Sequence, residues 1–140
     1  MPRRPFLAAV LAAGVVAGVV ACRSATAPAP GARVDLASVL PASPAYITGT
    51  VVERGRRLGR EPSVLVATDP RDPVAEPRDG DGNRSAHVVL GAGVLVVHRD
   101  GRRAGADDVR PGRVVTAWVG PAELRSLPPV VTGRVLVIEP

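Results

Sequence analysis

Turn-forming residues limit what this chain can fold into. The 140 residues include 15 glycines and 15 prolines, and from residue 45 onwards such residues divide the chain into short runs rich in valine. Runs of this kind, bounded by glycine, proline and aspartate, are typical of β-strands. None of them keeps a helical period long enough to predict a long helix. The sequence therefore predicts an all-β domain.

We expect five strands, over residues 46–53, 63–68, 86–98, 113–119 and 130–138. The third is long and contains Gly91 and Gly93, where we expect a bend or a bulge that leaves its register open. Asp100-Gly101 predicts a hairpin turn after it, residues 106–110 a single helical turn, and residues 120–129 a loop. Five short strands in about 95 residues favour a small, partly open barrel, because a barrel leaves few open edges.

The start of the chain has the pattern of an exported protein. Arg3 and Arg4 precede residues 6–21, an uncharged apolar run of sixteen residues. A stable transmembrane helix needs about 20 such residues, whereas a basic start followed by a shorter apolar run is typical of a secretory signal peptide. We therefore expect residues 1–21 to be removed by cleavage after Ala21.

The end of that run is more specific. Val19-Val20-Ala21-Cys22 resembles the lipobox of bacterial lipoproteins, in which the cysteine thiol receives a diacylglyceryl group. Cys22 is the only cysteine of the chain, and two acyl chains hold a protein stably on a membrane. We expect lipid attachment at Cys22; an ordinary signal peptide and an uncleaved anchor are the alternatives. Because Arg23 rather than aspartate follows the cysteine, the lipoprotein resemblance implies the outer membrane in a host that has one.

The mature chain then divides into two parts. Residues 22–44 contain the lipidated cysteine and a stretch rich in proline and alanine, which predicts a flexible linker. Residues 45–140 contain all the predicted strands. We expect them to fold alone as a monomer, with the linker dispensable for folding.

The order of these runs resembles a known family. The two segments that carry the resemblance are Asp108-Val109-Arg110-Pro111-Gly112-Arg113-Val114-Val115 and Ser126-Leu127-Pro128. They are similar to those of the YobA-like small secreted bacterial lipoprotein domains of unknown function, and the likeness spans most of residues 45–140. It implies a partly open barrel similar to the oligonucleotide/oligosaccharide-binding fold and an exported protein, but no activity. The insertion at residues 69–85 departs from the family pattern.

Two loop patterns have plain structural interpretations. Leu90-Gly91-Ala92-Gly93-Val94 lacks the third glycine and the helix of a dinucleotide-binding fingerprint, so we interpret it as the bend of a strand. Asp79, Asp81 and Asn83 begin a calcium-loop pattern whose required glycine and glutamate are missing. We expect residues 69–85 to form an exposed acidic loop, and whether it binds an ion stays open.

The remaining polar residues predict no catalytic, cofactor or metal site. His87 and His98 have no second cysteine or paired carboxylate to complete a metal set, and we expect both at exposed strand ends. Ser63, Ser85 and Ser126 lie outside any Gly-x-Ser-x-Gly motif. Hydrolytic catalysis therefore has no support in the sequence.

The charge pattern also limits the function. The formal charge of +5 falls to +3 when Arg3 and Arg4 leave with the signal peptide, too little to indicate nucleic acid. Tyr46 and Trp118 are too few aromatic platforms for single strands, and we expect Trp118 in the core. A basic turn is predicted between the first two strands, either solvated or in contact with anionic lipids or envelope polymers. Its residues are Arg54, Arg56, Arg57 and Arg60.

These observations predict a non-enzymatic lipoprotein of the cell envelope, tethered on the extracytoplasmic side by lipid on Cys22. We expect a binding or structural module without a cofactor, with an envelope polymer or protein as its possible partner. A small-molecule- or metal-dependent envelope enzyme is the alternative. An exported oligonucleotide-binding protein is a third class, which salt-dependent binding to single strands would reveal.

Overall fold

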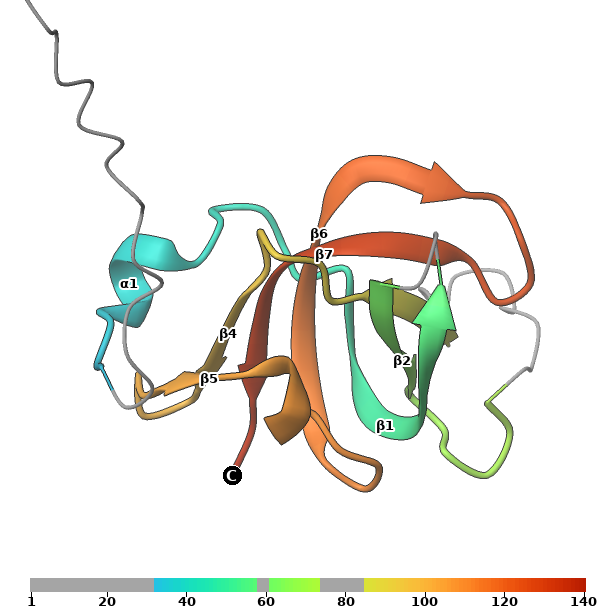
Figure 1. The fold of residues 1–140 in the computed structure, drawn as a ribbon, viewed down its shortest axis with the longest axis horizontal. Helices are drawn as coiled ribbons and strands as arrows, with labels where there is room; N and C mark the ends of the chain where they lie inside the picture. The colour runs from blue at the N-terminus through green and yellow to red at the C-terminus, as the bar shows by residue number, and fades with distance from the viewer. Residues whose placement is uncertain (1–31, 58–60, 74–84) are drawn as a thin grey trace, which may run out of the picture.

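The structure, a computed structural model, describes residues 32–57, 61–73 and 85–140. Within these ranges a seven-stranded sheet dominates, so the predicted all-β class is confirmed (Figure 1). Its elements are α1 (Leu36–Val39), β1 (Ile47–Arg57), β2 (Glu61–Ala67), β3 (Ser85–Val89), β4 (Leu95–His98), β5 (Arg103–Ala104), the 3-10 turn η1 (Ala106–Asp108), β6 (Val114–Leu124) and β7 (Val130–Ile138).

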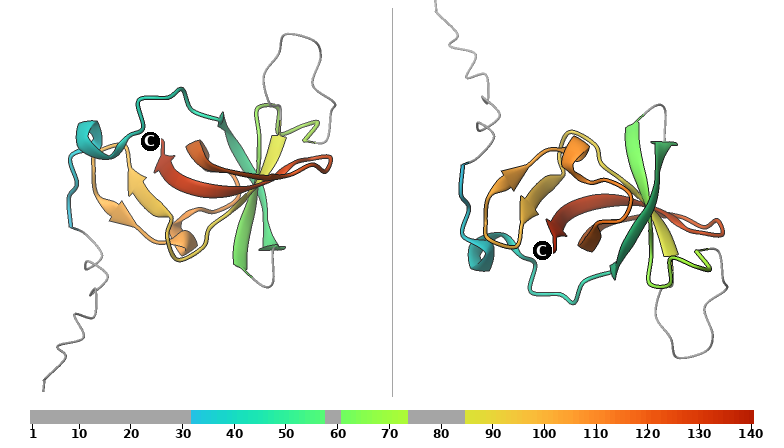
Figure 2. Two further views of the ribbon diagram at one scale, coloured as in Figure 1. Left: turned by 90° about the horizontal axis from the view of Figure 1, so that it is seen from above. Right: turned by 90° about the horizontal axis from the view of Figure 1, so that it is seen from below.

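Five of the strands close into a ring. They follow the order β3-β2-β1-β6-β7, and a parallel pairing of β3 with β7 joins the two ends. The views from above and below show β1 and β2 crossing β7 at one end of the molecule, with β4 and β5 at the other (Figure 2). The predicted small, partly open barrel is thus confirmed, and β4 and β5 extend its sheet from β7.

The predicted single strand over residues 86–98 is wrong. The chain turns after β3, where the carbonyl of Gly91 accepts a hydrogen bond from the Val94 N–H at 3.0 Å. β3 then pairs with the first part of β7, and β4 pairs with its last part. Glycines that bend a strand can also divide it, and only the pairing with a distant partner decides between the two.

Two strand boundaries also differ from the prediction. β1 continues to Arg57 and pairs with β2, so Arg54, Arg56 and Arg57 lie in a strand rather than in a basic turn. β6 continues to Leu124 through residues predicted as a loop. Pairing with the neighbouring strand supplies backbone hydrogen bonds that local composition does not reveal. The hairpin turn at Asp100-Gly101 is confirmed, since β4 and β5 pair across it.

Valine fills the inside of the ring. Alternate residues of a strand face opposite sides of the sheet, so every second side chain of a regular stretch faces this core, and β7 changes phase between Val131 and Leu136. The buried members of this core are Ile47, Val51, Val64, Val66, Ala86, Val88, Leu90, Val96, Val109, Val115, Ala117, Val131, Leu136 and Ile138.

A second apolar cluster lies on the opposite face of β4 and β7. Val97, Val135 and Val137 are buried there although they point away from the ring. The half-buried side chains that cover them are Val34, Leu36, Leu40, Leu95 and Trp118. Trp118, expected in the core, is half-buried and packs against this second cluster on the outer face of the sheet, not inside the ring.

Residues 32–44, assigned above to the linker, are bound to the sheet. Arg33 bridges to Arg102 beside β5, and the Val34 N–H donates to the Gly101 carbonyl at 2.8 Å. The Trp118 indole N–H donates to the Ser43 carbonyl at 2.9 Å. This segment, which we call the strap, covers the outer edge of β5 and the second apolar cluster.

Candidate functional site

Three strand ends meet at one edge of the sheet. β4 runs parallel to β7, so His98 lies beside Ile138 at the ends of both strands. β6 runs antiparallel to β7, which places Val115, near the start of β6, beside the same Ile138. The β4–β5 turn, the first residues of β6 and the last residues of the chain therefore come together although they are distant in sequence.

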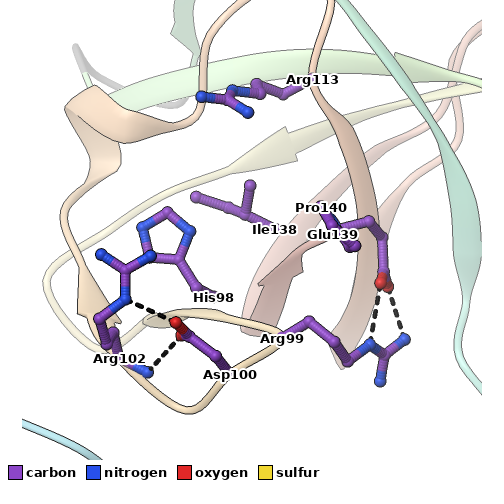
Figure 3. Close-up of a pocket in the computed structure, with 8 residues that line it drawn as sticks. All are labelled: His98, Arg99, Asp100, Arg102, Arg113, Ile138, Glu139 and Pro140. Atoms are coloured by element: carbon purple, nitrogen blue, oxygen red, sulfur yellow. Dashed lines mark hydrogen bonds and ion pairs between the residues drawn. The ribbon is translucent and has the colours of Figure 1, made fainter.

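A cavity of about 480 Å³ opens between them. That volume lies within the range of small-molecule sites, which is roughly 300–1,000 Å³. Figure 3 shows its lining, which is rich in arginine. The lining residues are His98, Arg99, Asp100, Arg102, Arg113, Ile138, Glu139 and Pro140.

Main-chain hydrogen bonds hold the walls of the cavity in place. The Arg99 N–H donates to the Ile138 carbonyl at 3.0 Å and ties the β4–β5 turn to β7. The Glu139 N–H donates to the Val114 carbonyl at 2.9 Å and ties the end of β7 to β6. Because these bonds belong to the sheet itself, the side chains that line the cavity start from fixed backbone positions.

Glu139 is the centre of a polar network in one wall. Both carboxylate oxygens accept hydrogen bonds from Arg99, at 2.6 and 2.8 Å, and Oε1 also accepts one from the Thr116 hydroxyl at 2.7 Å. Thr116 in turn accepts from Thr48 on β1 at 3.1 Å. Burial raises the pKa of Glu139, but the hydrogen bonds from Arg99 and Thr116 outweigh it and leave the pKa below its ordinary value of 4.5.

This lowered pKa makes the fold sensitive to acid. A carboxyl group whose pKa is lower in the folded state stabilises the fold fully above its unfolded pKa, and that contribution is lost as the pH falls through the folded pKa. The free energy of unfolding of Glu139→Gln should thus lie below that of the wild type at about pH 7, and the gap should close towards about pH 3. Urea unfolding across this range measures it.

Glu53→Gln is the matched control, because it removes one exposed carboxylate from β1. It reports the general effect of losing one negative charge. A gap between wild type and Glu139→Gln that stays constant with pH would contradict the assignment of acid sensitivity to Glu139.

The β4–β5 turn supplies a second ion pair. Arg102 Nε lies 2.6 Å from Asp100 Oδ2, and the Arg102 backbone N–H donates to Asp100 Oδ1 at 3.0 Å. These hydrogen bonds lower the pKa of Asp100. Gly101 between them has a φ of +84°, which glycine adopts without strain. The turn is therefore shaped by its own residues and holds Arg102 at the cavity.

The structure separates the two predicted histidines. His98 lies half-buried at the cavity, whereas His87 is only 8% exposed, so the expectation of an exposed His87 is wrong. His87 pairs with Val130 and His98 with Ile138, the first and last residues of β7. The two histidines therefore lie beside opposite ends of β7.

The other predicted patterns do not contribute to the cavity. Ser63 and Ser85 are buried in β2 and β3, and the Ser126 hydroxyl donates to the Pro128 carbonyl at 2.6 Å. The Leu90–Val94 pattern forms the turn between β3 and β4 and not the predicted bend within one strand. Asp79, Asp81 and Asn83, the possible calcium ligands, lie outside the described residues, as does Cys22.

Arg54, expected in a basic turn, forms an ion pair within the domain. Its guanidinium lies 3.0 Å from Asp107 Oδ1 in η1. Asp107 is 92% exposed, and ion pairs of this kind contribute little to stability. Arg60 lies outside the described residues.

Apart from His98, the sequence analysis named none of the residues that line the cavity as a candidate for a site. Arg99, Arg113 and Glu139 each come directly after or before a strand, which is a weak signal by itself. These residues come together only because β4 pairs in parallel with β7. A single continuous strand over residues 86–98, as expected from the sequence, does not predict that pairing.

Comparison with protein-family models, with curated proteins and with solved structures found no match. The resemblance to the YobA-like domains therefore stays a prediction. In the described ranges, no helix is long and apolar enough to cross a membrane. No three histidine, cysteine, aspartate or glutamate side chains gather as a possible metal site in that part of the chain.

Proposed function

We propose that this protein is a lipid-anchored module of the bacterial cell envelope that binds a ligand in the cavity at the end of β7. The cavity carries this proposal. It has the volume of a small-molecule site, fixed walls and charged side chains that face it (Figure 3). Sites that bind by preorganisation share these properties, because little freedom is lost when the ligand enters.

Non-enzymatic binding is the form of this function that the lining supports. Arg99 and Arg102 are each held by a carboxylate, and guanidinium groups stay protonated at all physiological pH values. Such groups recognise and orient a ligand but transfer no proton. The imidazole in the lining, His98, has no hydrogen bond to a carboxylate of the described residues that would orient it as a catalytic base. The ligand, an envelope polymer fragment or a smaller molecule, would be held and not converted.

The anchor is supported by Val19-Val20-Ala21-Cys22 and the apolar run before it. In this proposal the lipid on Cys22 holds the domain on the extracytoplasmic side of a membrane, which is the outer membrane in a host that has one. The family resemblance, with its exported lipoproteins, supports the same location.

Replacing Cys22 tests the anchor. In Cys22→Ser the precursor loses the thiol that accepts lipid, so labelling by a fatty-acid analogue should disappear and the domain should leave the membrane fraction. Ser24→Ala, two residues further on, is the matched control and should keep both label and location. A membrane-bound Cys22→Ser protein, together with an unlabelled wild type, would refute the lipid anchor.

A further inference from the structure

The cavity contains guanidinium groups that are not fully engaged by carboxylates. Arg99 is engaged, because Glu139 accepts two hydrogen bonds from it. Arg102 gives only its Nε–H to Asp100, which leaves its two terminal nitrogens. Within the described residues, Arg113 has no carboxylate within ion-pair distance of its guanidinium group. Two sets of donors are thus available to a ligand.

These donors lie on different walls. Figure 3 shows Arg113 on the β6 side and Arg102 on the β4–β5 turn, with the His98 ring beside Arg102. Imidazole carries at least one N–H in either protonation state, so His98 adds a further donor on the Arg102 side. An acceptor group placed between the walls would meet donors from both directions.

Arginine selects the chemistry of such an acceptor. Its planar fork matches the paired oxygens of a carboxylate or a phosphate, and hydrogen bonds between two charged groups are among the stronger ones in proteins. The side chains that line the cavity include three arginines and two carboxylates. Arg99 and Arg102 already neutralise those two carboxylates, so within the described residues the third guanidinium, Arg113, is the one with no carboxylate side chain at ion-pair distance.

We propose, on the basis of the proposed function, that the cavity binds a small organic anion whose carboxylate or phosphate group lies between Arg113 and Arg102. The organic part of the ligand fills the rest of the volume, against Pro140 and the aliphatic stems of the arginines. Long arginine stems offer apolar surface of this kind. Arg99 and Glu139 form the wall behind the ligand and stay paired.

Binding should be moderate and sensitive to salt. The Arg102 side chain is 53% exposed, and Arg113 is also exposed. Charges that face solvent are screened over about 8 Å at physiological ionic strength. The ligand therefore loses affinity as salt rises, whereas a ligand bound by apolar contacts alone would not.

Three matched probes test the proposal on the lipidated full-length mature protein in detergent: phenyl phosphate, benzoate and benzyl alcohol. They share a ring and differ in the head group. Calorimetry gives the affinity, and the NMR signals of the arginine Nε–H groups and of the Gly101 amide give the location. We expect one or both anions to bind at one site, to shift the signals of Arg102, Arg113 and Gly101, and to weaken with salt. The anion that binds with the higher affinity indicates whether the natural ligand carries a phosphate ester or a carboxylate.

Arg113→Gln should weaken binding of the preferred anion about tenfold or more, the usual scale for a charge-assisted hydrogen bond. Arg113→Lys keeps the charge but not the planar fork, so its affinity for the anion should lie between those of the wild type and Arg113→Gln. Arg134→Gln is the matched control, because it removes an exposed arginine of β7 that does not line the cavity. It should bind like the wild type.

The outcomes separate this inference from the proposed function. If benzyl alcohol binds in the cavity as well as the anions do, the anion inference is wrong, while the cavity remains a binding site. If Arg113→Gln and Arg134→Gln bind the anion equally, the assignment to Arg113 is wrong. If no probe shifts a cavity signal, the inference is overturned, and the lipid anchor is still decided by Cys22→Ser.

Discussion

Alanine at position 49 is expected to cost the domain a large part of its stability. Gly49 lies in β1 near the point where that strand changes partners, since residues 47–50 pair with β6 and residues 50–57 pair with β2. A Cβ atom at this position would overlap the backbone carbonyl of Ala67. Backbone atoms of a closed ring cannot move aside singly, so β1 and β2 would have to separate. We expect a loss of about 3–5 kcal/mol, the upper range for a single substitution.

Gly55→Ala is the matched control in the same strand. An added Cβ there meets only the Ser63 hydroxyl, at 3.9 Å. We expect its effect on the free energy of unfolding to stay within about 1 kcal/mol. Urea unfolding of both variants makes the comparison. Equal effects at the two positions would show that the close approach at Gly49 does not limit the fold.

Removal of the strap, residues 32–44, is the second change with a large expected effect. A domain that begins at Ala45 lacks Val34, Leu36 and Leu40, which cover the second apolar cluster. Full burial of such side chains contributes about 1.5–3 kcal/mol each, so three half-buried ones contribute about 3 kcal/mol together. The free energy of unfolding of a small domain is about 5–15 kcal/mol in total. We therefore expect residues 45–140 to be far less stable than residues 32–140.

Denaturant unfolding of the two fragments measures this difference. In the full chain, Leu36→Ala should show part of the same loss, whereas Ala37→Ser, at an exposed position of α1, should be nearly neutral. Equal stability of the two fragments would mean that the strap rests on the sheet without stabilising it. The earlier expectation of a dispensable linker would then hold.

The all-β fold could be predicted because its signals are local. Valine-rich runs end at glycine and proline, and Asp100-Gly101 marks a hairpin whatever surrounds it. The same locality explains the errors. Whether Gly91 bends one strand or separates two depends on β7, about forty residues away in the chain. Such pairings leave no pattern in the neighbouring residues.

The cavity and the strap were missed for a related reason. Val34, Leu36 and Leu40 are too few to predict a buried segment in a stretch rich in alanine and proline. They are buried only because β4 and β7 present a second apolar face. Likewise, the sequence around Arg113 or Glu139 does not indicate a site, because only the antiparallel register of β6 and β7 brings their strand ends together.

If Cys22 carries lipid as proposed, the strap also limits how far the domain can lie from the membrane. Nine residues, or ten residue steps, separate Cys22 from Ala32, the first described residue that is hydrogen-bonded to the sheet. At about 3.5 Å per residue, even a fully extended chain spans about 35 Å. With the proposed anchor, β5 and the neighbouring cavity would be confined to a thin layer above the lipid surface. Ligands that reach this cavity would therefore be collected from that layer, not from the wider extracytoplasmic space.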